Sequence, residues 1–271
     1  MTPTKPQILV TNDDGADSPI LLPLVRELSS FAQVNTVVPA SECSWTSKVI
    51  SRFKPIELAL IERDGFTIHT LSGYPADCAN IGIHNLSPNK PDLVVSGINI
   101  GSNAGLAFAL SSGTIGAAVE SFLSGVPAAA FSLELPLQGF ELWRCERRLD
   151  PALDELILES TSVTGEIVAE LLRGGLPEGS DIVAVNMPES TTCESPRRLT
   201  GMTQTGYSSL FARHETEPRF EFQDCQLSRV GEPSRGDRET LDKGEVSISP
   251  LRYSLDAPVC PTDRQRFEHS V

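Results

Sequence analysis

The segment Ile8-Leu9-Val10-Thr11-Asn12-Asp13-Asp14-Gly15 decides the predicted fold, because an apolar run ends abruptly in polar residues and a glycine. Such a run is typical of a strand buried on both faces, as in a parallel sheet. The polar cluster then lies at the strand's carboxyl end, where open α/β sheets bind their ligands. The adjacent carboxylates Asp13 and Asp14 would repel each other in a partly dry site, which favours a bound Mg²⁺. An ordinary polar turn is the alternative for this stretch alone.

The composition limits the partners of the chain. Its 271 residues carry a net charge of −14, which argues against a nucleic-acid polymer or an anionic membrane as the main partner. Residues 1–6 have no signal-like pattern and no long apolar run follows, so we expect a cytoplasmic protein. The six cysteines include no CxxC pair, and the four histidines form no HxH or HExxH pattern. Any hydrolytic chemistry would therefore have to use carboxylates and a metal.

An alternation of strands and helices follows the first strand. Apolar residues recur at helical spacing over 21–28, and 34–38 reads as a second strand, so a parallel pair with a right-handed crossover is expected. Further strands are predicted over 92–96, 127–132 and 181–186, and further helices over 75–86, 112–123 and 153–172. The pattern predicts an α/β fold, a Rossmann-like three-layer core with a mainly parallel sheet.

Two regions before residue 196 fall outside this alternation. Residues 53–61 and 67–71 predict a side hairpin that turns at Asp64-Gly65. Residues 134–150 lack clear periodicity and are interpreted as a linker or variable loop.

The chain changes character near residue 196. Residues 200–211 predict strand and turn outside the main sheet, and the polar residues 212–243 predict an exposed hairpin or an arm that becomes ordered on assembly. Residues 244–251 alternate at period two and predict a strand in or near a subunit interface. We therefore expect a catalytic core over 1–195, with a hairpin and C-terminal arm for oligomerisation over 196–271.

Two more polar clusters follow predicted core strands or open helices. Asn99 and Asn103 lie in a glycine-rich loop that could approach a ligand closely, although a flexible loop is the alternative. Ser112, Gly113 and Thr114 open a helix whose free amides would suit a phosphate, although ordinary capping is compatible with the same residues. We expect this amide end to be separate from the metal, so that Gly113→Val would spare metal binding.

Five motifs in order resemble the survival protein SurE family of metal-dependent nucleotidases. They are Asn12-Asp13-Asp14-Gly15, Pro39 with Ser44 five residues on, Gly73 to Cys78, Asp92 to Asn103, and Ser112-Gly113-Thr114 with Gly116-Ala117-Ala118. The resemblance is strong over residues 7–132 and weaker beyond. The chain departs from the family pattern at Trp45, where a glycine is usual, and at Tyr74, where a threonine is usual.

The resemblance implies a 5′-nucleotidase that hydrolyses nucleoside monophosphates to nucleoside and phosphate, as a homodimer or homotetramer. It implies one divalent cation per subunit, Mg²⁺ or Mn²⁺, and a proton acceptor that the sequence leaves open between Asp13 and Asp14. The metal ligands would be Asp13, Asp14, Ser44 and Asn99. The residues that bind phosphate or substrate would be Asn12, Asn99, Asn103, Ser112, Gly113 and Thr114.

Two alternatives stay open at this level. One aspartate could attack phosphorus directly, as in haloacid-dehalogenase-type phosphatases, although those space their acids as DxD. A non-catalytic nucleotide-binding or assembly protein on the same fold is the alternative of another class. The acid pair and Asn99 argue against it.

Overall fold

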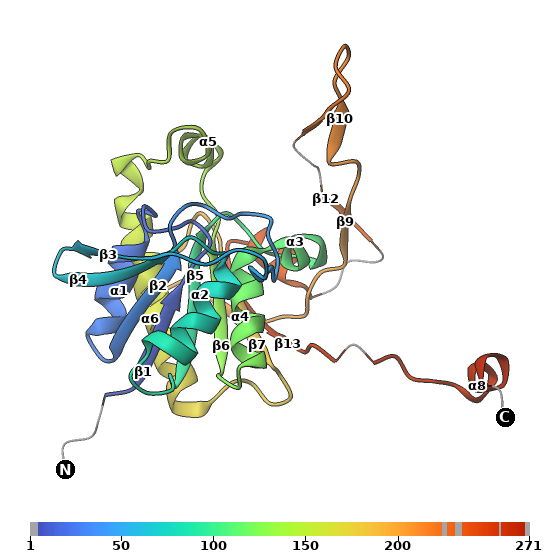
Figure 1. The fold of residues 1–271 in the computed structure, drawn as a ribbon, viewed down its shortest axis with the longest axis horizontal. Helices are drawn as coiled ribbons and strands as arrows, with labels where there is room; N and C mark the ends of the chain where they lie inside the picture. Colours follow the sequence, from blue (N-terminus) through green and yellow to red (C-terminus); the bar gives the residue numbers. More distant parts are fainter. Residues whose placement is uncertain (1–4, 224–226, 231–234, 255, 269–271) are drawn as a thin grey trace.

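The computed structural model describes residues 5–223, 227–230, 235–254 and 256–268, and in these nine strands form one sheet (Figure 1). Their order is β3-β4-β2-β1-β5-β6-β7-β13-β8. The strands are β1 Gln7–Thr11, β2 Gln33–Pro39, β3 Leu58–Arg63, β4 Phe66–Leu71, β5 Leu93–Ile100, β6 Ala128–Leu133, β7 Ile182–Met187, β8 Arg197–Leu199 and β13 Val246–Leu251.

The central strands are parallel, as the sequence predicts. β1 lies between β2 and β5 and pairs in parallel with both, and β5, β6 and β7 continue in parallel. After β1 the chain forms β2, β3 and β4 on one side of β1, and it then continues with β5, β6 and β7 on the other side. The boundary between β1 and β5 is therefore a topological switch point. Ligand sites of open α/β sheets lie at the carboxyl ends of strands at such a point. Asp13 follows β1 at this place.

Helices cover both faces of the sheet, which confirms the three-layer α/β prediction. α1 Leu21–Ser29 packs on α6 Asp154–Gly174 on one face, and α2 Pro75–Ile81 packs on α4 Gly113–Leu123 on the other (Figure 1). Every residue of β6 and β7 is buried, because each strand is covered on both faces. The continuous apolar runs in the sequence follow from this burial.

Two predicted loop regions have more structure than the sequence indicates. Residues 134–150 are not a linker: Leu137–Glu146 form the helix α5, which buries Trp143 in the core. The 53–71 hairpin is present as β3 and β4, but β4 also pairs in parallel with β2. The hairpin therefore forms one edge of the main sheet.

The region after residue 196 is divided between the sheet and an arm. β9 Thr205–Tyr207 pairs with β12 Leu227–Arg229, and β10 Phe211–Arg213 pairs with β11 Phe220–Phe222, all outside the main sheet as predicted. We call residues 205–223 and 227–230 the arm; it projects away from the sheet in Figure 1. By contrast, β13 lies within the sheet, antiparallel to β7 and parallel to β8.

The location of β13 bears on the predicted subunit interface. Both edges of this strand are already paired, so it has no free edge with which to pair a partner chain. The division of the chain at residue 195 stays a prediction, and β8 and β13 complete the sheet that the first part begins. Two short helices, α7 Asp237–Leu241 and α8 Pro261–Phe267, follow the arm and the sheet, respectively. Of the described helices, none is both long and apolar enough to span a membrane.

Candidate active site

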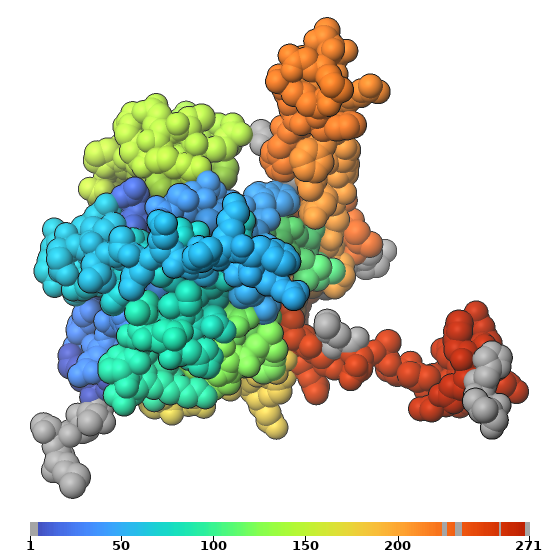
Figure 2. All heavy atoms as spheres, viewed as in Figure 1, coloured from blue at the N-terminus to red at the C-terminus, as the bar shows by residue number. Residues whose placement is uncertain are grey.

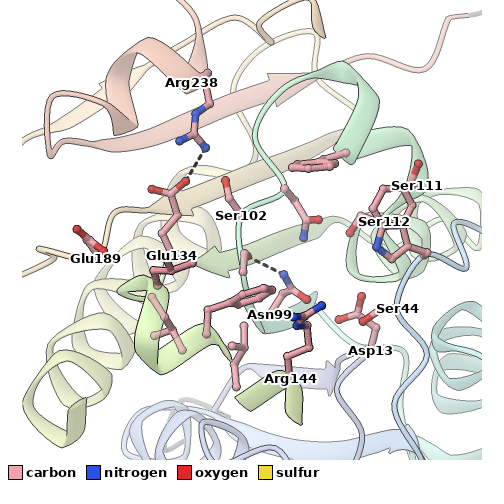
Figure 3. A pocket seen from close by; sticks show the side chains of 18 of the residues that line it. Asp13, Ser44, Asn99, Ser102, Ser111, Ser112, Glu134, Arg144, Glu189 and Arg238 are labelled. Atoms are coloured by element: carbon pink, nitrogen blue, oxygen red, sulfur yellow. Dashed lines mark hydrogen bonds and ion pairs between the residues drawn. The ribbon is translucent and has the colours of Figure 1, made fainter. Parts of the chain in front are cut away.

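A cavity of about 800 Å³ opens at the carboxyl ends of β1 and β5. It lies between α5 and the arm, which rise as two separate projections in Figure 2, and both contribute to its walls. Five residues predicted from the sequence line this cavity: Asp13, Ser44, Asn99, Asn103 and Ser112. Residues that are 99 positions apart in the chain thus meet at one site (Figure 3).

Asp13 is the buried acid of the cavity, with 2% of its surface exposed. Thr114 donates two hydrogen bonds to its carboxylate, from Oγ1 to Oδ1 at 2.6 Å and from the backbone N to Oδ2 at 3.1 Å. Burial raises the pKa of Asp13 from its ordinary 3.8 to about 6, although the two bonds from Thr114 lower it. The N-terminus of α4 therefore orients this carboxylate and favours its charged form.

Asp14 lies behind Asp13 and is not among the residues that line the cavity. Its Oδ2 accepts a hydrogen bond from the backbone N of Ile100 at 3.0 Å, which fixes the acid to the end of β5. Burial, and then the neighbouring charge of Asp13, raise the pKa of Asp14 well above its ordinary value. Two buried acids with raised pKa values form a site that a cation would stabilise in its charged state.

The loop that carries Ser44 is fixed at both ends. The backbone N of Cys43 donates to the backbone O of Asp13 at 2.7 Å, and the N of Ser47 donates to the O of Ser111 at 3.0 Å. Gly116 permits this contact, because a Cβ there would stand 2.0 Å from the backbone O of Ser47. Gly116 thus makes room for the Ser44 loop.

Asn99 and Asn103 each use the amide nitrogen within the protein. Nδ2 of Asn99 donates to the backbone O of Gly101 at 2.7 Å, and Nδ2 of Asn103 donates to Oγ of Ser132 at 2.8 Å. Both side chains are mostly buried and line the cavity. Each amide nitrogen is held by one hydrogen bond, and the carbonyl oxygen of each side chain is the group that could bind a cation.

The start of α4 is closer to Asp13 than expected. Ser112 caps the helix, since its Oγ accepts from the N of Ile115 at 3.2 Å. A Cβ on Gly113 would lie 3.0 Å from Cβ of Asp13 and 3.1 Å from its Oδ2. The N–H and hydroxyl of Thr114 both bond to Asp13. These contacts argue against the expected separation between a metal end and an amide end, because Gly113 and Thr114 both contact Asp13.

Asn12 shapes the loop that follows β1. Its Nδ2 donates to the backbone O of Gly15 at 3.0 Å, and its Oδ1 accepts from the N of Gly15 at 3.1 Å. This closed turn holds the loop that contains Asp13 and Asp14. The predicted contact of Asn12 with substrate remains a prediction, and both polar atoms of its side chain are already occupied.

Sequence reasoning missed several residues of the cavity wall. In the view of Figure 3, Arg144 lies near Asn99, whereas Glu134 and Arg238 lie toward the opposite end and form an ion pair at 2.6 Å. Phe140 of α5 and Phe222 of the arm line the cavity as well. Glu134 directly follows the core strand β6, so its location at the end of a strand could have indicated it. Nothing in the local sequence indicates Arg144, Phe140, Phe222 or Arg238, because α5, the arm and α7 reach the cavity through tertiary packing alone.

The donors in the cavity fit a hard divalent cation. Asp13 offers a carboxylate, Ser44 a hydroxyl and Asn99 a carbonyl oxygen, and oxygen donors are those that Mg²⁺ and Mn²⁺ prefer. Within the described part of the chain, no group of three or more His, Cys, Asp or Glu side chains could hold a metal. A metal here would therefore depend on the acid pair together with neutral oxygen ligands.

Comparison with known proteins agrees with this geometry. The family model described as survival protein SurE matches residues 8–209. The chain belongs to the SurE family. A SurE 5′-nucleotidase of Methanocella arvoryzae is 32% identical over 256 residues, covering 93% of each chain, and one of Methanoculleus marisnigri is 34% identical over 258 residues, covering 93% of this chain and 94% of the relative. The crystal structure of a SurE protein from Aquifex aeolicus has a TM-score of 0.72 at 27% identity, over 93% of this chain and 95% of that one.

SurE membership accounts for the order of the motifs along the chain. The matched region contains all the predicted site residues, from Asn12 to Thr114. It ends within the arm, so the last strand of the sheet, β13, lies beyond it.

Proposed function

We propose that this SurE-family chain is a divalent-metal-dependent phosphomonoesterase, a 5′-nucleotidase that hydrolyses nucleoside monophosphates to nucleoside and phosphate. The observation that carries the proposal is the convergence of Asp13, Ser44 and Asn99 on one cavity of about 800 Å³. A cavity of this size accommodates a nucleotide. The relatives named SurE 5′-nucleotidase support the reaction.

The metal would be held by Asp13, Asp14, Ser44 and Asn99, one Mg²⁺ or Mn²⁺ per subunit. When bound, such a cation polarises phosphoryl oxygens and lowers the pKa of water. Of the two acids, Asp13 lines the cavity and Asp14 does not, so Asp13 is the better placed to accept a proton from the attacking water. Asp14 would then serve as a ligand, oriented by the backbone N of Ile100.

The phosphate would lie beside the first turn of α4. Ser112 and Asn103 line the cavity there and would contact the phosphoryl oxygens. Gly113 does not line the cavity and would act indirectly, because its missing side chain leaves room for Asp13 and Thr46. Thr114 would act through Asp13, since both of its donors are bonded to that carboxylate.

Assembly into a homodimer or homotetramer remains part of the proposal, as does a cytoplasmic location. Support for assembly comes from the arm, which leaves Phe211 and Phe220 largely exposed. Apolar side chains that gather on a projecting segment are typical of a surface that contacts another chain.

The function is tested by measuring phosphate release from the 5′- and 3′-monophosphates of the four ribonucleosides. We expect release in the presence of Mg²⁺ or Mn²⁺ and its loss in EDTA, with recovery when the cation is restored. Binding of nucleotide without any release would identify the chain as a non-catalytic nucleotide-binding protein. Release that persists in EDTA would contradict the metal requirement.

Metal affinity should rise with pH through about 6, because the pKa of Asp13 is about 6 in the metal-free protein and the cation binds the deprotonated acid. Calorimetric titration with Mn²⁺ from pH 5 to 8 measures this affinity. A constant affinity over that range would contradict the expectation. The same raised pKa also affects stability: because it exceeds the ordinary 3.8, the contribution of Asp13 to the free energy of unfolding decreases as pH rises from about 4 through about 6.

A further inference from the structure

Trp45 has a location that the proposed reaction does not use. It directly follows Ser44, lines the cavity and leaves 44% of its surface exposed. A large aromatic side chain left open in a cavity offers a flat apolar surface to a ligand. Its neighbours show what kind of ligand this surface fits.

Trp45 belongs to an aromatic wall, which we define as Trp45, Phe108 and Phe222. Phe108 packs edge-to-face on Trp45 with ring centroids 5.8 Å apart, and Phe222 does so at 5.6 Å. All three line the cavity. They come from the loop after β2, from α3 (Leu106–Ser111) and from β11 of the arm, so three separate elements form one surface.

Contacts behind the wall hold it in place. Tyr207 lies 6.1 Å from Trp45 and Phe211 lies 6.0 Å from Phe222, measured between ring centroids. Trp45 has a φ of 61°, a left-handed conformation that is costly for a residue other than glycine. The hydrogen bond from Ser47 to Ser111 fixes the loop in this conformation. The wall is therefore arranged before any ligand binds.

We propose that the aromatic wall binds the nucleobase of the substrate by stacking, with Trp45 as the main surface, an inference that takes its substrate class from the proposed function. Trp45 is covalently next to Ser44, so a nucleotide whose phosphate lies at Asp13 has its base within the same cavity as the wall. Stacking strengthens with the area of the base. The wall therefore favours purine over pyrimidine nucleotides.

A purely structural role for Trp45 makes different predictions. If the ring only docked the arm on the core, its loss would affect every phosphate ester alike. If it stacks on the base, its loss affects nucleotides and leaves an ester without a base unchanged. Ribose 5-phosphate is the ester that separates the two roles.

The kinetic test compares Trp45→Leu with the unchanged chain on AMP, UMP and ribose 5-phosphate. We expect the KM for AMP to rise about tenfold, the KM for UMP to rise less, and kcat and the KM for ribose 5-phosphate to stay unchanged. Trp45→Phe should restore most of the affinity for AMP. Phe53→Ala, which removes an exposed ring that does not line the cavity, is the matched control. Equal rises for AMP and ribose 5-phosphate, or none, would overturn the inference.

A binding test keeps the inference distinct from the proposed hydrolysis. The chain has two tryptophans, and Trp143 is only 4% exposed, so Trp143→Phe leaves Trp45 as the sole indole fluorophore. Adenosine, which has no phosphate, should quench its emission to saturation. If adenosine quenches the emission but the protein releases no phosphate from any nucleotide, the stacking inference is supported and the proposed hydrolysis is overturned. If the protein releases phosphate from AMP but adenosine causes no quenching, only the stacking inference is overturned.

Discussion

Asp13→Asn should lower kcat/KM for phosphate release by about 10³-fold, and metal affinity with it. Asparagine keeps the size of the side chain but removes the charge that binds a cation and accepts a proton. The contacts to Thr114 can survive, because the amide oxygen can accept from the backbone N while the hydroxyl turns to accept from the amide. The activity would therefore be lost because the charge is removed, and not because the local structure changes. Phosphate release and Mn²⁺ titration measure it.

The same substitution should stabilise the metal-free protein at pH 8. It removes one of two adjacent buried charges, and the charge of Asp13 is one cause of the raised pKa of Asp14. A melting temperature that is unchanged or higher, together with lost activity, is the expected pair of results. Asp92→Asn is the control, since Asp92 is an exposed acid that bonds to Gln7 where β1 begins. Near-normal activity of Asp13→Asn with metal bound would exclude Asp13 as the ligand.

Gly113→Val should lower kcat/KM by about 10²-fold and weaken metal binding by at least about tenfold. A Cβ at this position would lie 3.0 Å from both Cβ of Asp13 and Oγ1 of Thr46, and a branched side chain needs more room still. The carboxylate of Asp13 and the Ser44 loop would both have to shift. Metal affinity and inhibition by inorganic phosphate, measured on the same preparation, show whether the two losses occur together.

Gly201→Val is the matched control for this substitution. A Cβ on Gly201 has no neighbour within 4 Å, so the same change of side chain meets no obstacle there. Its activity should stay close to that of the unchanged chain. Loss of phosphate inhibition in Gly113→Val with intact metal affinity would show that the metal and amide ends are separable after all.

The sheet could be predicted because its strands are buried on both faces. The apolar runs that become β1, β5 and β7 are continuous, and continuous runs bounded by turn residues identify core strands well. The helix α5 could not be predicted in this way. Its apolar residues Leu137, Phe140 and Trp143 recur every three positions for less than three turns, and only Trp143 is buried. The pairing of β13 with β7 joins residues about 65 positions apart and has no local signal.

The sequence predicted which residues of the candidate site come together at the ends of strands. It did not predict the hydrogen bonds between them. Asp13, Ser44 and Asn99 each follow or end a strand of the sheet, so topology alone brings them together. The attachment of Thr114 to Asp13 spans 101 positions, and a helix start offers its donors equally to a phosphate or to a carboxylate. Sequence pattern cannot distinguish these two acceptors.

The location of β13 has a consequence for synthesis of the chain. Translation produces β7, then β8 and the whole arm, before residues 246–251 leave the ribosome. Until then, the nascent sheet ends at β7, a fully buried strand whose outer edge has no partner. Exposed edges of apolar strands pair readily with other chains. The last strand of the sheet thus closes the edge at which unfinished chains would otherwise associate.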